Sequence, residues 1–213
     1  MSNRAPRRAL VVIDVQMEYF EGGGLPIEHP PVAQTLPNIG RAMDAARAAG
    51  VPVVVVQHDA PAGAPLFQPG SERWQLHPEV ARRPHDHFIT KHFPSAFTGT
   101  GFADWLAERG IDTLTVVGYM THNCDAGTVF EAMHRGLKVE FLADASGALP
   151  YANAAGRASA EEVHRVFSVV FHSNFAAVGS TQAWMDALSQ GQRLPVDNVL
   201  ASNQRARSAA ALA

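Results

Sequence analysis

Six short apolar runs, rich in β-branched residues, alternate along the chain with segments that have helical features. We expect strands at 8–15, 51–58, 87–91, 112–118, 137–144 and 175–179. Strands of a parallel sheet are buried on both faces, and they therefore form near-continuous hydrophobic runs of this kind. We expect helices at 34–50, 101–110, 123–135, 158–174 and 180–190. The alternation predicts an α/β fold with a mainly parallel sheet covered on both faces.

The length and composition fit one ordinary globular domain. The chain has 213 residues, of which 46% are hydrophobic and 17% are charged. We expect a single domain spanning 1–213, with its core in about 8–190. The tail, 202–213, is expected either to fray or to contribute to an oligomer contact.

Several classes of protein are disfavoured by the same composition. The net charge is −3, and Arg4, Arg7 and Arg8 are too few to form a nucleic-acid-binding face. No apolar run approaches the roughly 20 residues that cross a bilayer, so we expect no membrane partner. The single cysteine excludes an internal disulfide and predicts a reducing compartment, the cytoplasm.

Chemically capable residues lie where the predicted strands end. Asp14, Lys91 and Cys124 follow the first, third and fourth strands. Ligands of open α/β sheets bind outside the carboxyl ends of the strands, so these side chains are expected at one edge. Other polar residues at the same edge are Gln16, His58, Asp59 and Asp144.

An acid, a lysine and a cysteine together suit nucleophilic catalysis. An ammonium and a helix N-terminus both favour the thiolate over a thiol whose free pKa is about 8.5. Asp14 is placed to take the thiol proton and to return it to a leaving amine, and Gly118 permits a sharp turn before the cysteine. Each residue alone has an ordinary interpretation, since a lone Cys is usually core, a strand-end Asp caps a helix and a Lys is solvated. Their coincidence at one edge favours a site.

Three motifs in order carry a resemblance to a known family. They are IDVQMEYF (13–20), KHFPSAF (91–97) and GYMTHNC (118–124). Over roughly residues 8–190 the chain resembles the isochorismatase-like cysteine hydrolases, which include nicotinamidases and N-carbamoylsarcosine amidases. The resemblance implies a Rossmann-like three-layer α/β/α sandwich with a six-stranded, mainly parallel sheet. It also implies a homo-oligomer and a small-molecule substrate.

The resemblance assigns roles to particular residues. It implies a catalytic triad of Asp14, Lys91 and Cys124. It further implies a cis peptide bond between Tyr119 and Met120, and an oxyanion hole formed by the amides of Met120 and Cys124. Thr121 is expected to hold the turn. Candidate substrate-binding residues are Gln16, Phe20, His58, Trp74, Phe97 and Tyr119.

The sequence departs from the family pattern at two places. Nicotinamidases of this superfamily bind a metal through Asp-x-His after the second strand, where this chain has Gln57-His58-Asp59. His77, His85 and His87 in the loop 59–86 and just beyond it do not replace that motif, so we expect no metal and no cofactor. Asp125 directly follows the cysteine. Its charge would oppose thiolate formation unless the side chain points away, and the sequence leaves both possibilities open.

The predicted activity is hydrolysis of a small amide or related C–N bond through a thioester on Cys124. One alternative is isochorismatase-type vinyl-ether hydrolysis, which uses Asp14 without covalent catalysis. A second alternative is a non-catalytic binding or scaffold protein with the same fold. The residues do not specify the substrate or the number of subunits.

Overall fold

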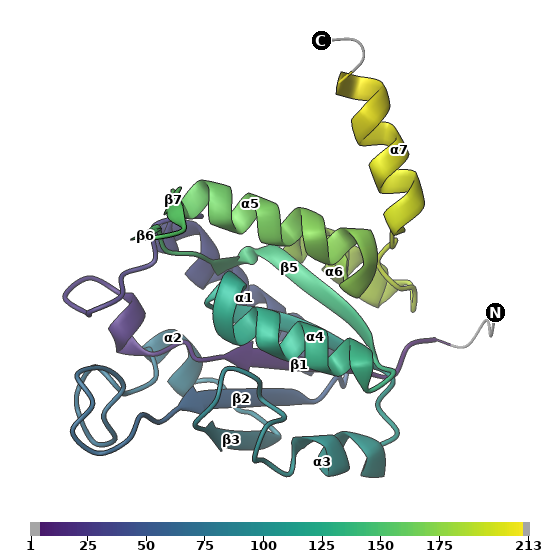
Figure 1. Ribbon diagram of the computed structural model, residues 1–213. Coiled ribbons are helices and arrows are strands. Elements are labelled where there is room, and N and C mark those ends of the chain that lie inside the picture. Colours follow the sequence, from purple (N-terminus) through teal and green to yellow (C-terminus); the bar gives the residue numbers. More distant parts are fainter. Residues whose placement is uncertain (1–4, 211–213) are drawn as a thin grey trace.

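A single six-stranded sheet forms the centre of the molecule in the computed structural model, which describes residues 5–210 (Figure 1). Its strands run in the order β3-β2-β1-β4-β5-β8, and every neighbouring pair is parallel. Their bounds are β1 Arg8–Ile13, β2 Val53–His58, β3 His87–Lys91, β4 Thr113–Tyr119, β5 Lys138–Gly147 and β8 Ala177–Gly179. The expected α/β sandwich with six strands is confirmed.

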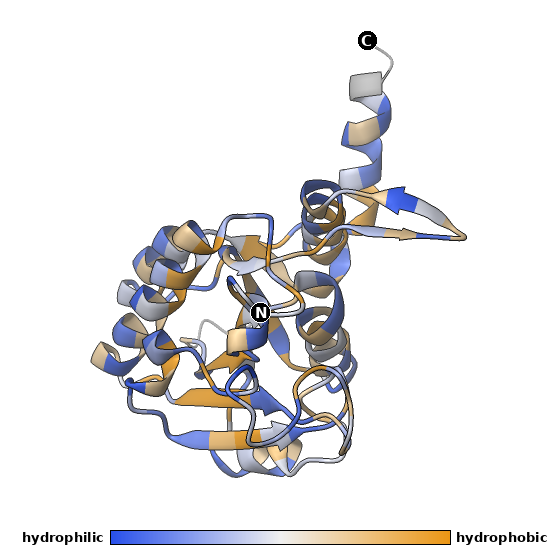
Figure 2. Ribbon diagram, turned by 90° about the vertical axis from the view of Figure 1, so that its left-hand side faces the viewer, coloured by the Kyte–Doolittle hydropathy of each residue, from blue (hydrophilic) through white to orange (hydrophobic). Residues whose placement is uncertain are grey.

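The central strands are apolar because both of their faces are covered. In β1, Leu10 and Val12 point to one face of the sheet, whereas Val11 and Ile13 point to the other, and all four are 0% exposed. Figure 2 shows the hydrophobic colour concentrated on the strands and hydrophilic residues on the surrounding helices. Side chains that alternate between two buried layers explain why the sequence of each strand is a continuous apolar run.

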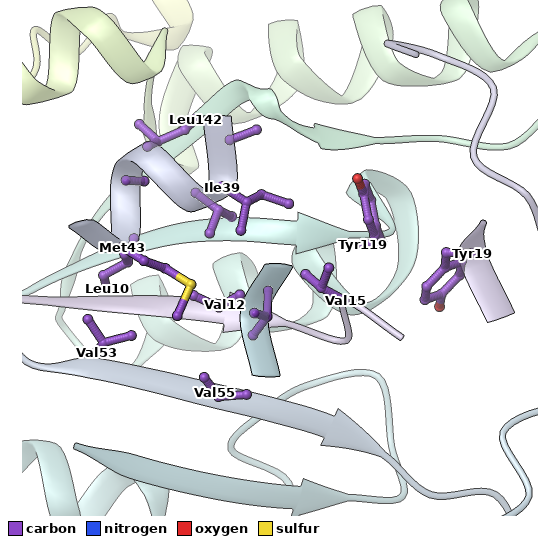
Figure 3. Close-up of a cluster of buried hydrophobic side chains, with 14 of the residues drawn as sticks. Leu10, Val12, Val15, Tyr19, Ile39, Met43, Val53, Val55, Tyr119 and Leu142 are labelled. Carbon is purple, nitrogen blue, oxygen red and sulfur yellow. The ribbon is translucent and has the colours of Figure 1, made fainter. Parts of the chain in front are cut away.

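Two layers of helices cover the sheet. α1 (Val32–Ala48) and α6 (Thr181–Ser189) pack on the face of Leu10 and Val12, where Ile39 and Met43 fill the space between helix and strands (Figure 3). α3 (Phe102–Glu108), α4 (Ala126–His134) and α5 (Ala160–Val170) cover the opposite face. The result is a three-layer α/β/α arrangement.

The remaining elements are short or peripheral, and several of them were not predicted. The expected loop 59–86 contains a one-turn helix, α2 (Pro78–Ala81), and β6 (Tyr151–Asn153) pairs with β7 (Gly156–Ala158) in a hairpin just before α5 (Figure 1). Further turns are η1 (Met17–Tyr19), η2 (Thr121–Asp125) and η3 (Phe171–Phe175). Most of the predicted tail lies in α7 (Val199–Ala210), and 211–213 fall outside the described residues. Within residues 5–210, no helix combines the length and apolar character that a bilayer crossing requires.

The strand order reverses at one point of the sheet. Connections from β1 lead through β2 to β3 on one side, and the chain then returns to place β4 on the other side of β1. Such a reversal separates the loops at the carboxyl ends of the two central strands and leaves room for a ligand. Asp14 follows β1 and Cys124 follows β4, so both lie at this switch point.

Gly118 is required by a close approach of backbones inside the sheet. It pairs with Ile13 in register and has a φ of +118°. A Cβ atom at this position would lie 2.1 Å from the carbonyl oxygen of Ile13, which cannot move without breaking the sheet. Gly118 was predicted to lie in a strand and to permit a turn, but its close contact with Ile13 was not predicted.

We expect Gly118→Ala to destabilise the fold by more than about 3 kcal/mol, because a left-handed conformation and a backbone clash add together. Gly136→Ala is the matched control. Gly136 also has a positive φ, +84°, but nothing lies within 4 Å of its would-be Cβ, so only about 1–2 kcal/mol should be lost. Urea unfolding of both variants measures the difference. Equal losses would show that the contact with Ile13 is unimportant.

Candidate active site

The side chains of Asp14, Lys91 and Cys124 meet at the carboxyl edge of the sheet. The Nζ atom of Lys91 lies 2.7 Å from Oδ2 of Asp14 and 3.3 Å from Sγ of Cys124. The side chains of Lys91 and Asp14 are both 0% exposed. The structure thus brings together the three residues that the sequence selected, and it makes the lysine the bridge between the acid and the thiol.

Asp14 has an unusual backbone conformation at the end of β1. Its φ is +49°, in the left-handed region that side-chain-bearing residues rarely adopt. The conformation is held by hydrogen bonds on both sides, from the Asp14 amide to the Val56 carbonyl and from the Gln16 amide to the Asp14 carbonyl. Strain of this kind clusters at functional sites, where the surroundings must enforce it.

Cys124 lies on a π-helical turn between β4 and α4. The sequence placed it at the start of an α-helix, but η2 intervenes and α4 begins only at Ala126. The Met120 carbonyl accepts the amides of Asn123 and Asp125. The peptide bond from Tyr119 to Met120 is cis. The Thr121 hydroxyl contacts Nδ1 of His164 on α5 at 2.8 Å, which ties the turn to the helix layer.

The electrostatics of the site favour a protonated thiol at rest. Burial raises the pKa of Cys124 well above its usual value, the charge of Asp14 raises it further, and Lys91 only partly opposes both. The sequence-based expectation that Lys91 favours the thiolate has the right direction, but it omitted burial and the Asp14 charge, which together raise the pKa by more. Burial disfavours the charge of Lys91, yet Asp14 and Cys124 outweigh that effect and raise its pKa.

His58 is the fourth side chain at this point. It pairs in register with Lys91 across β2 and β3, and its Nδ1 atom lies 3.4 Å from Lys91 Nζ. Its ring is half-buried and meets the Phe67 ring edge-on, with 5.3 Å between centroids. Burial and the positive charge of Lys91 lower the pKa of His58.

Gln16 and Trp74 fix the segments around the site. The amide nitrogen of Gln16 donates to the carbonyls of His58 and Trp74, and its oxygen accepts the His58 amide, at 2.7–3.0 Å. Gln16 is 0% exposed, and its side chain joins the ends of two strands. The indole of Trp74 donates to Asp59 and is partly exposed, as a residue of a pocket wall is.

Three aromatic residues that the sequence assigned to the substrate pocket are buried in the core. Phe20 packs against His77 with the rings tilted and their centroids 4.3 Å apart, and Phe97 packs against Phe102 with centroids 4.8 Å apart. The Tyr119 hydroxyl bonds to Thr35 of α1 at 2.7 Å (Figure 3 shows the Tyr119 ring). Their exposures are 7%, 3% and 0%, respectively, so these rings shape the site through packing.

The sequence reasoning missed two residues beside the nucleophile. His122 lies on η2, and its Nε2 atom is 3.0 Å from the hydroxyl of Tyr151 on the β6–β7 hairpin. Burial lowers the pKa of His122 to about 4. Burial and the nearby Cys124 raise the pKa of Tyr151. His122 was inside the quoted motif GYMTHNC, whereas no local pattern around Tyr151 indicates that its hairpin returns to the cysteine.

The histidines considered as metal ligands have separate structural partners. His77 caps α2 by accepting the Glu79 amide, and His87 stacks on Trp105 with ring centroids 4.8 Å apart. His85 lies near Phe88. Within residues 5–210, no group of three or more His, Cys, Asp or Glu side chains is arranged to hold a metal ion. Asp144, the remaining strand-end acid, instead accepts both the amide and the hydroxyl of Thr181 at the start of α6.

Asp125 is buried behind the nucleophile. It is 0% exposed, and neither carboxyl oxygen has a hydrogen-bond partner of good geometry among the described residues. Burial raises its pKa well above the usual value, the charge of Asp14 raises it further, and the nearby Ser146 hydroxyl opposes the shift. A raised pKa favours the uncharged acid, which opposes the thiolate less than a carboxylate would.

Comparison with known proteins assigns the chain to a family. The isochorismatase domain model matches residues 8–183, and the chain belongs to the isochorismatase family. A crystal structure of a putative isochorismatase from Burkholderia xenovorans LB400 has 63% identity, with a TM-score of 0.95 over 97% of this chain and 99% of that one. The isochorismatase family protein YddQ of Bacillus subtilis is 31% identical over 83% of this chain and 98% of its own length.

Other relatives have names that state an activity. The secreted isochorismatase effector Isc1 of Verticillium dahliae is 36% identical over 65% of this chain and 71% of its own length. Proteins named streptothricin hydrolase, ureidoacrylate amidohydrolase and N-carbamoylsarcosine amidase are 30–33% identical over 62–66% of this chain and 54–69% of theirs. The chain is therefore an isochorismatase-like hydrolase.

We expect Asp125→Asn to stabilise the protein at neutral pH. The folded-state pKa of Asp125 is raised, so between about pH 3.9, its unfolded pKa, and the folded pKa only the folded state holds the proton. Stability then falls as the pH rises through this window, by up to about 1.4 kcal/mol per pH unit. Asparagine has the same shape and does not ionise.

Urea unfolding at pH 4 and pH 8 tests this expectation. The variant and the wild type should be close in stability at pH 4, and the variant should be the more stable at pH 8. A variant that is less stable at both values would show that Asp125 is an ionised, well-bonded carboxylate. Asp186→Asn, at an exposed position on α6, is the control.

Proposed function

We propose that the protein hydrolyses a small amide or related C–N bond through a thioester on Cys124. The observation that carries the proposal is the position of Lys91, whose ammonium contacts the Asp14 carboxylate at 2.7 Å and the Cys124 sulfur at 3.3 Å. A buried acid, base and nucleophile at hydrogen-bond distances are what covalent acyl transfer needs. The names of several relatives, which are hydrolases or amidases of C–N bonds, agree with this chemistry.

The first half of the reaction forms the thioester. Asp14 takes the proton of the Cys124 thiol, while Lys91 stabilises both anions, and the sulfur attacks the carbonyl carbon. The amides of Met120 and Cys124 receive the oxyanion. Asp14 then gives its proton to the departing amine, and the C–N bond breaks. Because the thiol has a raised pKa, proton removal is expected to accompany attack instead of preceding it.

The second half releases the acid. A water molecule enters the position left by the amine, and Asp14 takes one of its protons as it attacks the thioester. The tetrahedral oxyanion forms at the same amides, and its collapse expels the sulfur, which recovers a proton from Asp14. The carboxylic acid leaves, and all three residues return to their starting protonation states.

The walls of the site favour a small polar substrate. His58, His122 and Tyr151 lie near the nucleophile and carry groups that can hydrogen-bond, and the pKa values of both histidines are lowered. An uncharged lining of this kind suits a neutral amide or ureido group better than a strongly charged one. These groups support the proposal of a small-molecule substrate.

We also propose a single-domain homo-oligomer that acts in the cytoplasm. Self-association is supported by exposed apolar side chains on α5 and near α7, namely Val166, Val169, Val170, Val196, Val199 and Leu200, which are 40–70% exposed. The cytoplasmic location is supported by the single, unpaired cysteine. The name of the Verticillium relative describes that protein as secreted.

We expect Cys124→Ala to abolish amide turnover, with a loss of at least about a thousandfold, because no other nucleophile lies at the triad. A panel of small amides and ureido compounds is screened for ammonia or amine release, and intact-mass spectrometry of the wild type is used to detect the acyl adduct. Turnover that survives in the variant would favour the acid-only, vinyl-ether type of hydrolysis. A wild type that turns over no member of a broad panel, and forms no adduct, would favour a binding protein.

We expect Asp14→Asn to separate thiol reactivity from turnover. The Asp14 charge raises the pKa of Cys124, so its removal lowers that pKa and moves the pH profile of iodoacetamide alkylation toward acid. Hydrolysis should nevertheless fall by about 100-fold or more, because the general acid and base is gone. An alkylation profile that stays in place would show that Asp14 does not interact with the thiol.

A further inference from the structure

Lys91 has one more partner than the reaction requires. A lysine ammonium has three N–H groups and no acceptor. Three acceptor atoms lie around its Nζ, namely Oδ2 of Asp14 at 2.7 Å, Sγ of Cys124 at 3.3 Å and Nδ1 of His58 at 3.4 Å. The Asp14 contact is an ion pair without hydrogen-bond geometry, whereas the Cys124 and His58 contacts are hydrogen bonds of the ammonium.

This geometry fixes the proton of His58. Since the ammonium can only donate, Nδ1 of His58 must be the unprotonated, accepting nitrogen. The neutral ring then carries its proton on Nε2, for which the structure shows no hydrogen-bond partner within residues 5–210. We propose that His58 is a positioning residue that holds Lys91 through Nδ1 and presents Nε2–H to an acceptor group of the substrate.

The position of the His58 ring is fixed by contacts of its backbone and by contacts of its side chain. The backbone amide and carbonyl of His58 are held by the side chain of Gln16. The parallel register of β2 and β3 places His58 directly beside Lys91, and the Phe67 ring restricts its other face. A side chain fixed in this way can hold the ammonium in one orientation at little further entropic cost.

The charges around His58 keep it neutral near pH 7. Lys91 and His92 disfavour a second positive charge, whereas Asp14 and Asp59 favour it. Burial and Lys91 dominate, and the pKa of His58 is lowered. A protonated His58 would place an N–H against the ammonium, and Lys91 would lose its third acceptor.

The proposal deepens the proposed function, because it gives the substrate a required feature. A group that accepts a hydrogen bond from Nε2–H, such as a second carbonyl oxygen or an ether oxygen near the scissile bond, is expected in good substrates. The positioning of Lys91 does not depend on which C–N bond is cleaved. The two parts can therefore be tested separately.

Two substitutions divide the functions of the two ring nitrogens. The oxygen of Asn lies close to the position of Nδ1, so His58→Asn keeps an acceptor for Lys91 and removes the Nε2 donor. The terminal amide of Gln reaches the position of Nε2, so His58→Gln keeps a donor for the substrate and removes the acceptor beside Lys91. His134→Asn, at an exposed position on α4, is the control.

Alkylation by iodoacetamide measures the state of the triad without a substrate. We expect His58→Asn to keep the wild-type rate at pH 7–8, and His58→Gln to lose about tenfold, the effect of one hydrogen bond to a charged group. In amide turnover, His58→Asn should raise KM by about tenfold with kcat nearly unchanged, while His58→Gln should lower kcat.

Nitrogen NMR of isotopically labelled histidine reads the tautomer in the wild-type protein, with the His58 signal assigned from its absence in His58→Asn. A proton on Nε2 supports the proposal, and a proton on Nδ1 overturns it whether or not the variants fold. Equal alkylation rates for Asn, Gln and wild type would also overturn it. Failure of the proposed function appears differently, as turnover that survives Cys124→Ala while the tautomer and the alkylation pattern are as expected.

Discussion

The buried ammonium of Lys91 is the interaction on which the site depends. Its side chain is 0% exposed, and a charge removed from water costs several kcal/mol unless partners replace the solvent. Asp14 replaces it as an ion-pair partner, and Cys124 and His58 replace it as hydrogen-bond acceptors. The lysine consequently fixes the distance between acid and thiol, and the loss of any partner disturbs the other two.

The sheet supplies the precision that this arrangement needs. Asp14, His58, Lys91 and Cys124 follow or end four adjacent strands, so their separations are set by backbone hydrogen bonds. The close contact of Gly118 with Ile13 brings the end of β4 against β1. Sites held by strands keep their geometry better than sites held by loops. The nucleophile is the exception, because it lies on a π-helical turn directly after β4.

Much of the fold and the triad could be predicted from the sequence, because both are expressed in local patterns. Apolar runs such as VPVVVVQH give the strands, and the residues that follow them mark the edge where ligands bind. The left-handed Asp14, the π turn and the hairpin at Tyr151 leave no such local signal. The protonation of Cys124 and Asp125 was also beyond the sequence, because it depends on burial that only the folded chain creates.

The β6–β7 hairpin is joined to the nucleophile turn by one bond, between Tyr151 and His122. The strands of the central sheet position the triad, whereas Tyr151 belongs to the β6–β7 hairpin, which is inserted between β5 and α5. Changes in the hairpin can therefore alter which molecules reach Cys124 without moving a catalytic atom. Replacing the β6–β7 hairpin with that of a relative is therefore a way to change the substrate of such an enzyme and to keep its catalytic residues.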